Sequence, residues 1–301
     1  STDTHPQFSI ESAMAGKQSF CEKPIAHDLA EIDGALKIVE EEGVKLQIGF
    51  NRRFDTNHMR LKQAIESGEI GVPHMLSIIS RDPAPPPIEY IKVSGGLMMD
   101  MMIHDFDMCR FLLGEVVEMY AMADVKVDPA IGEAGDIDTA KVMLKFENGV
   151  IGTIENSRKA VYGYDQRVEV FGSGGAASTG NWYANQVTIS NANSVHRDLP
   201  MNFFMDRYID SYANEMIAFV DAVENDKPVP VVGNDGRVPV VMAKAGMLSV
   251  KENRPVKLSE ITWRESILIN VTQIEWDRHG IPDFPKWVNL LLSDDIYKNI
   301  V

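Results

Sequence analysis

The sequence predicts a mixed fold, in which a short α/β segment with parallel strands is followed by a larger α+β part with a mostly antiparallel open sheet. Two strand-like runs flank a helical pattern near the N-terminus, which is typical of a parallel βαβ unit. Farther on, strand-like runs follow one another with few helices between them. The 301 residues are 45% hydrophobic and 24% charged, which suits one large or two smaller globular domains.

The elements expected near the N-terminus alternate between helix and strand. Asp28 stands where a helix N-cap is expected, with Glu31 three residues on, and Gly43 stands where that helix would end. Apolar residues at helical spacing between them give the helix one buried face. The expected elements are helices at residues 7–16 and 28–42 and strands at residues 17–21 and 44–50.

The rest of the chain is richer in strand-like runs. Asn148-Gly149 separates two of them, and this dipeptide is typical of a tight β-hairpin turn. Gly68 and Gly114 mark the expected ends of two helices. Strands are expected at residues 74–80, 117–127, 139–146, 150–156, 167–171 and 186–190, and helices at residues 57–67, 99–113, 206–224 and 238–251.

Charge and composition exclude several classes of partner. The chain has 44 acidic and 29 Lys and Arg side chains, a net charge of −15, so nucleic acid is not an expected partner. We expect no membrane span, since no apolar run is long enough, and no signal peptide pattern. The only cysteines, Cys21 and Cys109, argue against a disulfide framework or a four-cysteine zinc site and favour a cytoplasmic location.

The segment 95–107 contains the sharpest candidate for chemistry. If it is helical, Asp100 and His104 lie four residues apart on one face. A carboxylate beside an imidazole orients the ring and raises its basicity, which suits a general base near neutral pH. The alternative interpretation is a surface Asp–His pair without a catalytic role.

A metal site in the same region is not predicted. His104, Asp105, Asp107 and Cys109 stand close together in the sequence. On one helix, however, successive side chains point about 100° apart, so these four cannot converge on one ion. Their spacing also differs from that of a zinc site.

Polar residues follow both strands of the predicted parallel unit, at the edge where open α/β sheets place their ligands. Lys23, in Glu22-Lys23-Pro24, can hydrogen-bond a substrate hydroxyl or take part in proton transfer. Asn51, Arg52 and Arg53 end the next strand, and two arginines there can bind a carboxylate or a phosphate. The alternatives are a solvated loop lysine and a surface charge pair.

Three further features are weaker. His5 can cap the helix that follows it or lie beside a ligand. Tyr164, in the loop Tyr162-Gly163-Tyr164-Asp165, can offer a phenol group to a ligand, although a packing role is the alternative. The segment 172–175 is glycine-rich like a phosphate loop, but no helical pattern follows it, so we do not interpret it as one.

Taken in order, these elements resemble the Gfo/Idh/MocA family, named after glucose–fructose oxidoreductase and inositol dehydrogenase. The resemblance covers about residues 1–261. Within the family, Ile103-His104-Asp105-Phe106-Asp107 and the run from Tyr162 to Arg167 look closest to inositol 2-dehydrogenases. The matching segments are residues 1–5, 21–26, 49–55, 95–107, 162–172, 203–215 and 254–259.

The resemblance implies oxidation of a cyclic polyol or sugar by hydride transfer to NAD, with NADP not excluded. It implies that Lys23 contacts substrate and cofactor, that His104 accepts the hydroxyl proton, and that Asp100 orients His104. It also implies a homo-oligomer, a dimer or tetramer, formed through the open sheet. Thr4, His5 and Glu22 are the further candidates for cofactor binding, and Asn51, Arg53 and Tyr164 are the candidates for substrate binding.

The resemblance also predicts a division into domains. Residues 1–53 are expected to be the C-terminal part of a Rossmann domain, 54–261 a substrate-binding and oligomerisation domain, and 262–301 a tail outside the family pattern. The family begins with a strand, a Gly-x-Gly-x-x-Gly turn and a helix, so we expect at least two βα units of the Rossmann domain to be absent. One alternative is therefore a catalytically inactive remnant that oligomerises or binds a ligand. Another is a different activity of the family, such as reduction of a keto-sugar.

Overall fold

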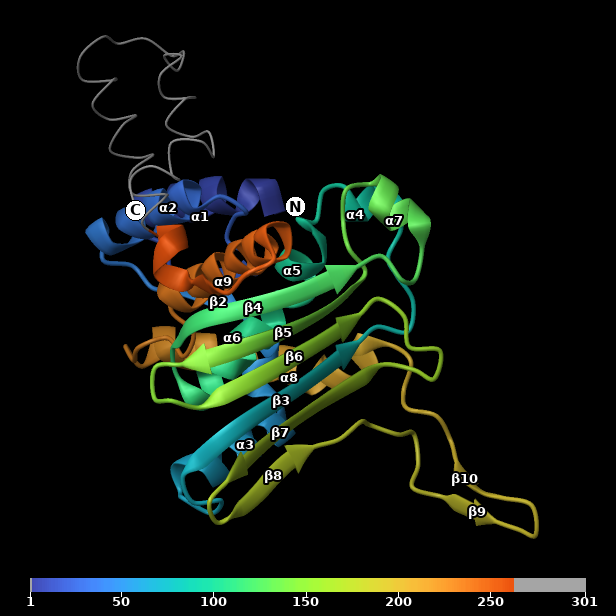
Figure 1. Ribbon diagram of the computed structural model, residues 1–301. Coiled ribbons are helices and arrows are strands. Elements are labelled where there is room, and N and C mark those ends of the chain that lie inside the picture. The colour runs from blue at the N-terminus through green and yellow to red at the C-terminus, as the bar shows by residue number, and fades with distance from the viewer. Residues whose placement is uncertain (1, 263–301) are drawn as a thin grey trace. The chain divides into compact units, whose positions relative to one another are not determined.

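A seven-stranded sheet is the largest element of the structure (Figure 1). The computed structural model describes residues 2–262, so the predicted tail lies outside the described residues apart from Thr262. The elements named below belong to one unit that ends at Leu258. The strand order is β11-β4-β5-β6-β3-β7-β8. The strands are β3 (Pro73–Arg81), β4 (Val116–Asp124), β5 (Thr139–Phe146), β6 (Ile151–Ser157), β7 (Asp165–Gly172), β8 (Gly175–Thr179) and β11 (Val256–Lys257).

The sheet is mostly antiparallel, as predicted, with one parallel pair between β3 and β6. The Asn148-Gly149 turn joins β5 to β6 with Gly149 at φ +87°, a left-handed conformation that glycine adopts freely. The glycine-rich segment 172–175 closes the β7–β8 hairpin, where Gly172 pairs with Gly175. It therefore leads into a strand rather than into the N-terminus of a helix.

The predicted βαβ unit is confirmed. Strands β1 (Ser19–Glu22) and β2 (Leu46–Gly49) are parallel, and α2 (Leu29–Glu41) connects them. The Asp28 side chain caps α2 by accepting from the Ala30 and Glu31 amides at 2.8 and 3.3 Å. Helix α1 (His5–Met14), preceded by the 3-10 turn η1 (Thr2–Thr4), packs against α2.

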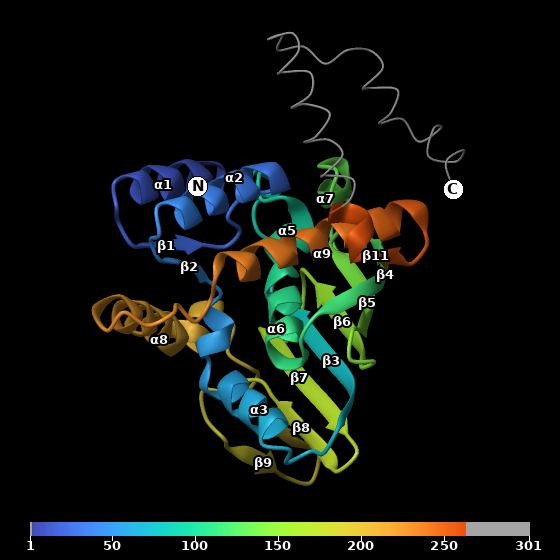
Figure 2. The ribbon, with the colours of Figure 1, turned by 90° about the vertical axis from the view of Figure 1, so that its left-hand side faces the viewer.

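Helices cover one face of the large sheet, and no described helix covers the other (Figures 1 and 2). Helix α9 (Gly233–Glu252) packs on β4, and helix α6 (Ile103–Leu113) contacts β3. Side chains of β5 alternate accordingly: Val142 and Leu144 are buried, whereas Met143 and Lys145 are exposed. The remaining helices are η2 (Asn51–Phe54), α3 (Thr56–Glu66), α4 (Ile88–Ile91), α5 (Gly96–Asp100), α7 (Pro129–Glu133) and α8 (Phe204–Glu224).

The prediction of one continuous helix at residues 99–113 is wrong. Helix α5 ends at Asp100, and α6 begins at Ile103. In a continuous helix the Asp100 carbonyl would accept from the His104 amide. It accepts instead from Lys23 Nζ at 2.7 Å, while the His104 amide bonds to the Met101 carbonyl at 3.4 Å. A long-range contact thus replaces the local one and breaks the helix.

The strand expected at residues 186–190 is not part of the large sheet. The structure places β9 (Thr188–Ser190) in a separate two-stranded hairpin with β10 (Val195–Arg197), outside the large sheet (Figure 1). Strand β8 and the short helices α4 and α7 were not expected, because short elements carry too few residues to show a period.

The alternation along β5 generates a stability prediction. Leu144→Ala should lower the free energy of unfolding by about 2–5 kcal/mol, because it leaves a cavity in the core between sheet and helices. Lys145→Ala, on the neighbouring residue of the opposite face, should change it by no more than about 0.5 kcal/mol. Urea denaturation of both variants measures this, and equal losses would show that the two faces are assigned wrongly.

Candidate active site

A cavity of about 290 Å³ lies where β1 and β2 end, between η2, the α5–α6 break and the N-terminal half of α8. Five of the predicted site residues line it, although they are far apart in the sequence. These five are Lys23, Asn51, Asp100, His104 and Tyr164, and the cavity is also lined by Arg52, Asp82, Tyr90, Met101, Phe204, Tyr208 and Tyr212.

Lys23 follows β1 directly and extends its side chain to the end of α5. Its Nζ donates to the Asp100 carbonyl at 2.7 Å and lies 3.6 Å from Asp100 Oδ1. Burial lowers the pKa of Lys23, and the positive charge of Arg52 acts in the same direction, while Asp100 opposes both. The ammonium is therefore fixed in place, and a neutral form of this lysine is more accessible than for a lysine in water.

Asp100 holds Lys23, not His104. Its Oδ1 accepts from the Tyr90 hydroxyl at 2.9 Å and its Oδ2 from Arg158 Nη1 at 3.0 Å. The expectation that Asp100 orients the His104 ring through the spacing of one helix is therefore wrong, because the helix breaks between them and the carboxylate is committed to other partners. Asp100 still lines the cavity beside Lys23.

His104 lies in the first turn of α6 and faces the same cavity. Its Nδ1 is buried and has no hydrogen-bond partner among the described residues. Burial and the positive charges of Lys23 and Arg52 hold the pKa of His104 well below its usual 6.5. The ring is consequently neutral near pH 7, which is the state that can accept a proton.

Arg52 is held by a buried network at the cavity wall. Its Nη1 donates to Asp105 Oδ1 at 2.7 Å and to Ser80 Oγ at 3.3 Å, and its Nη2 lies 3.4 Å from the Tyr164 hydroxyl. Asp105 also accepts from Asn156 Nδ2 at 2.8 Å. Buried ion pairs that are fully hydrogen-bonded fix geometry, so Arg52 presents a stationary positive charge to the cavity.

Arg53, predicted as a substrate-binding residue, points elsewhere. Its guanidinium binds both oxygens of Asp107 at 2.6 to 3.0 Å and reaches Asp235 at 3.1 Å. It does not line the cavity. Successive residues of the η2 turn point in different directions, so only one of the two arginines can face the site, and that one is Arg52.

Asn51 and Tyr164 do reach the cavity, where both are buried. Asn51 Nδ2 has no hydrogen-bond partner among the described residues, so it is available to a ligand. The Tyr164 ring packs edge-on against Tyr208 with centroids 6.2 Å apart. Burial raises the pKa of Tyr164 well above 10, so its hydroxyl stays protonated.

The sequence interpretation missed several lining residues, chiefly Asp82, Tyr90, Tyr208 and Tyr212. Burial, together with Asp100 and Asp105, raises the pKa of Asp82 to about 6, although Arg158 and Arg52 oppose the shift. Asp82 stands in a proline-rich loop and Tyr90 in a four-residue helix, and neither segment has a periodic pattern that would mark it. The signal available in the sequence was the position of Asp82, which directly follows strand β3.

The predicted cofactor-binding residues gather at one end of β1. His5 Nδ1 lies 2.9 Å from the Pro24 carbonyl, next to Lys23. Glu22 lies against Gly49, where a Cβ would come within 2.8 Å of Glu22 Oε2. Thr4 precedes His5 at the start of α1. These residues and the unpartnered His104 Nδ1 fit the nicotinamide end of a dinucleotide, because they surround the carboxyl end of a parallel strand.

Other kinds of site find no support in the part of the chain that the structure describes. No group of His, Cys, Asp and Glu there is arranged to hold a metal ion. Cys21 and Cys109 are free and buried. Among residues 2–262, no helix combines the length and apolar character that a membrane span requires.

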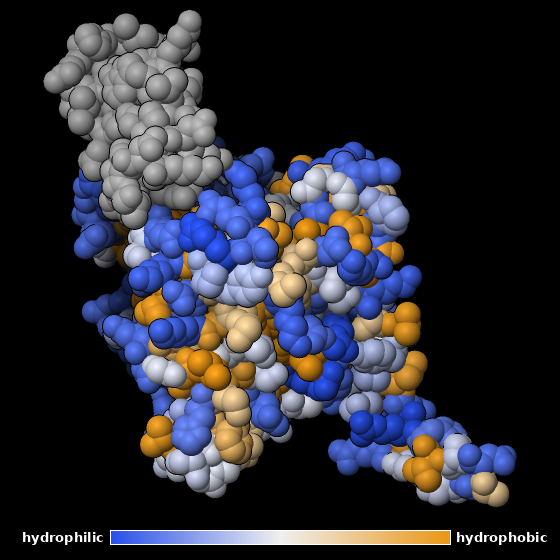
Figure 3. All heavy atoms as spheres, viewed as in Figure 1, coloured by the Kyte–Doolittle hydropathy of each residue, from blue (hydrophilic) through white to orange (hydrophobic). Residues whose placement is uncertain are grey.

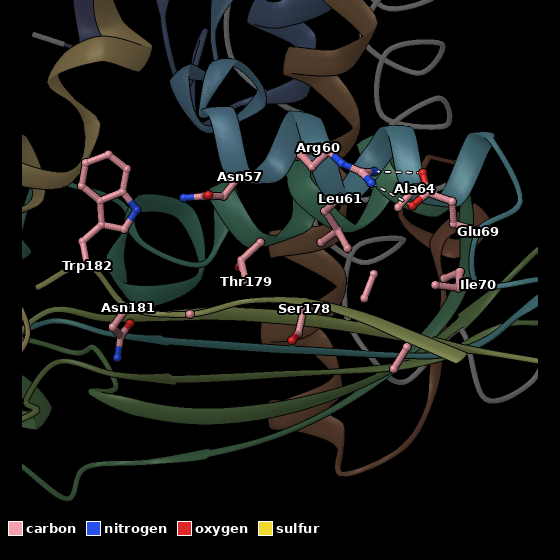
Figure 4. Close-up of a pocket in the computed structure, with 13 residues that line it drawn as sticks. Asn57, Arg60, Leu61, Ala64, Glu69, Ile70, Ser178, Thr179, Asn181 and Trp182 are labelled. Carbon is pink, nitrogen blue, oxygen red and sulfur yellow. Dashed lines mark hydrogen bonds and ion pairs between the residues drawn. The ribbon is translucent and has the colours of Figure 1, made fainter. Parts of the chain in front are cut away.

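A second cavity, of about 570 Å³, lies between α3 and β8 (Figure 4). Arg60 and Glu69 on its rim bind each other through two hydrogen bonds of 3.1 and 2.7 Å. Asn181 is engaged with Asp165 and with the Gln166 amide. The cavity is larger than the one beside His104, but its charged groups neutralise each other, so we place the chemistry in the smaller cavity.

The fold and the site define a dinucleotide-dependent oxidoreductase of two parts, and the comparisons agree. Residues 1–50 match the oxidoreductase family with an NAD-binding Rossmann fold, and residues 58–178 match the GFO/IDH/MocA C-terminal domain. The chain is 47% identical over 262 residues to the myo-inositol 2-dehydrogenase of Thermotoga maritima, covering 87% of this chain and 78% of the relative. The chain therefore belongs to the Gfo/Idh/MocA family.

Solved structures show the same architecture. A Thermotoga maritima protein whose structure was solved as a probable dehydrogenase, 47% identical, superposes with a TM-score of 0.85 over 87% of this chain and 79% of that one. The scyllo-inositol dehydrogenase of Lactobacillus casei with bound NAD(H) and scyllo-inositol, 28% identical, has a TM-score of 0.80 over 86% and 78% of the two chains. The predicted combination of a Rossmann-type domain with an α/β domain is thereby confirmed.

The surroundings of His104 generate a prediction about its titration. Its imidazole should remain neutral at pH 6.5 and take up a proton only at lower pH, because burial and two neighbouring cations disfavour the charged form. NMR titration of the histidine ring signals, assigned with a His104→Asn variant, measures this pKa. A value of 6.5 or higher would contradict the described environment.

Proposed function

We propose that this protein oxidises a secondary hydroxyl of an inositol or a related cyclic polyol, with NAD rather than NADP as the hydride acceptor. The observation that carries the proposal is the pairing of a neutral His104 with the Lys23 ammonium on one cavity. The inositol dehydrogenases named above, one of them with NAD(H) and scyllo-inositol bound, support the choice of substrate and cofactor.

Lys23 and His104 have different roles in this reaction, one in binding the reacting oxygen and the other in proton transfer. Lys23 donates a hydrogen bond to the reacting oxygen and stabilises the negative charge that develops on it. His104 accepts the proton of the same hydroxyl, which its neutral ring can do near pH 7. NAD, when bound, supplies the hydride acceptor, and Lys23, Glu22 and His5 are the residues that would lie at its nicotinamide end.

Recognition of the remaining hydroxyls falls to the polar wall of the cavity. Asn51 offers an unpartnered amide, and Asp82 offers carboxylate oxygens that accept hydrogen bonds. Tyr164 and Tyr208 supply both hydroxyls and aromatic surface. A cavity rich in donors and acceptors fits a polyol better than an apolar substrate, because each buried polar group then finds a partner.

The test of this function is the activity of the full-length enzyme and its His104→Ala variant. The wild type should reduce NAD with myo-inositol or scyllo-inositol and should use NADP less well. His104→Ala should lower kcat by about 10²–10⁴, the range expected for loss of a general base. Spectrophotometric assay of NADH formation measures both. No turnover of any cyclic polyol would overturn the function, and a loss below threefold would remove His104 from the proton transfer.

We also propose that the open face of the sheet joins copies of this chain into a homo-oligomer. Met75, Met143, Ile151 and Phe171 are each about half exposed and lie around one shallow cavity on this face. Figure 3 shows apolar surface on the side that Figure 1 presents, which no described helix covers. A second copy would remove this apolar surface from water.

A charge in this patch should break the oligomer. Met143→Glu should shift the protein to monomers in light scattering coupled to size-exclusion chromatography, because two carboxylates would be buried across a symmetric contact. Met59→Glu, at an equally exposed methionine on α3, is the matched control and should leave the mass unchanged. A monomeric wild type, or an unchanged Met143→Glu variant, would contradict the proposal.

A further inference from the structure

A buried arginine that the proposed chemistry does not use lies behind the site. Arg158 follows β6 and is 1% exposed. Its backbone amide donates to the Asp138 carbonyl at 2.9 Å, which fixes the start of the side chain. Its Nη1 donates to Asp100 Oδ2 at 3.0 Å, and its Nη2 lies 3.9 Å from Asp136 Oδ2. The guanidinium therefore stands between two carboxylates.

Those two carboxylates belong to the two ends of α5. Asp136 accepts from the Leu97 amide at 3.1 Å, in the first turn of the helix. The close approach of Asp136 leaves no room for a Cβ at Gly96, whose φ is +80°. Asp100 is the last residue of α5. Arg158 thus hydrogen-bonds to the last residue of α5 and forms a longer ion pair with the carboxylate that holds the first turn, while its Nη2 and Nε have no hydrogen-bond partner among the described residues.

The end of α5 is where Lys23 is held. Asp100 offers Lys23 both its carbonyl, at 2.7 Å, and its carboxylate, at 3.6 Å. A helix of five residues has too few internal hydrogen bonds to fix its own last turn. The contacts of Arg158 supply that constraint, and they neutralise part of the Asp100 charge that Lys23 would otherwise balance alone.

We propose that Arg158 is a positioning residue, which sets the location and charge balance of Lys23 through Asp100. The role rests on the proposed function, since it assumes that Lys23 serves the reacting oxygen. Arg158 itself does not line the cavity, so it has no direct contact with substrate to lose. The charged and titratable groups that face Lys23 are Asp100, Glu22, Arg52, His104 and His27.

The test compares Arg158→Gln with Arg60→Gln, an exposed arginine on α3 with its own carboxylate partner. Arg158→Gln should lower kcat by up to about 100-fold, as a displaced catalytic group does, with little change in KM for the polyol. Added guanidinium ion at a non-denaturing concentration should restore part of kcat. Arg60→Gln should behave as the wild type. An unchanged kcat in Arg158→Gln, or a loss that guanidinium does not restore, would overturn the proposal.

A second readout does not depend on turnover. Reaction of Lys23 with an amine-specific acylating reagent, followed by mass spectrometry across pH, reports the pKa of Lys23 in the full chain. Arg158→Gln should raise the pKa of Lys23, because a nearby cation that shares the charge of Asp100 is removed. An unchanged Lys23 titration in a folded variant would overturn the proposal even if inositols proved not to be substrates.

If Arg158→Gln does not fold, Asp136→Asn replaces it in both experiments. The asparagine keeps an oxygen for the Leu97 amide but removes the charge that faces Arg158. A smaller loss of kcat in the same direction is expected, whereas the pKa of Lys23 should fall rather than rise, because an anion instead of a cation is removed. Circular dichroism and the thermal midpoint establish that each variant is folded before it is compared.

Discussion

The bond between Lys23 and the end of α5 is the constraint on which the site depends. The Asp100 carbonyl accepts from Lys23 instead of from a helix amide, and α6 begins at Ile103, after two intervening residues. This break turns the first turn of α6, with His104, toward the cavity. This hydrogen bond, between residues 77 apart in the sequence, is one of the contacts between the βαβ unit and the helices that cover the large sheet, and it brings donor and base together.

Electrostatics follow from the same contact. Lys23 and Arg52 place two positive charges around His104, and burial removes the water that would screen them. Burial and the two cations keep the imidazole neutral, and Asp100 and Asp105 hold the cations in place. A base that is neutral beside two fixed cations is suited to taking a proton from a hydroxyl whose oxygen becomes negative.

Patterns in the sequence predicted most of the longer elements but not their contacts. The βαβ unit, the hairpin at Asn148-Gly149 and most strands of the sheet follow from periodicity and turn residues. The residues that line the cavity could be predicted only in part. Lys23 and Asn51 follow the two parallel strands, so both were expected at the same edge of that sheet. Arg52 and Arg53 could not be distinguished, because Asp105 and Asp107 choose between them only in three dimensions. No sequence pattern marked Arg158, because its partners Asp100 and Asp136 are 58 and 22 residues away in the sequence.

The most direct measurement is a crystal structure of the full-length enzyme with an inositol and NADH. We expect one hydroxyl oxygen to lie within hydrogen-bond reach, about 2.6–3.2 Å, of both Lys23 Nζ and a ring nitrogen of His104. Its carbon should face the nicotinamide, with Asn51 and Tyr164 on other hydroxyls. An inositol bound in the cavity between α3 and β8, or one whose nearest oxygen reaches neither Lys23 nor His104, would contradict this expectation.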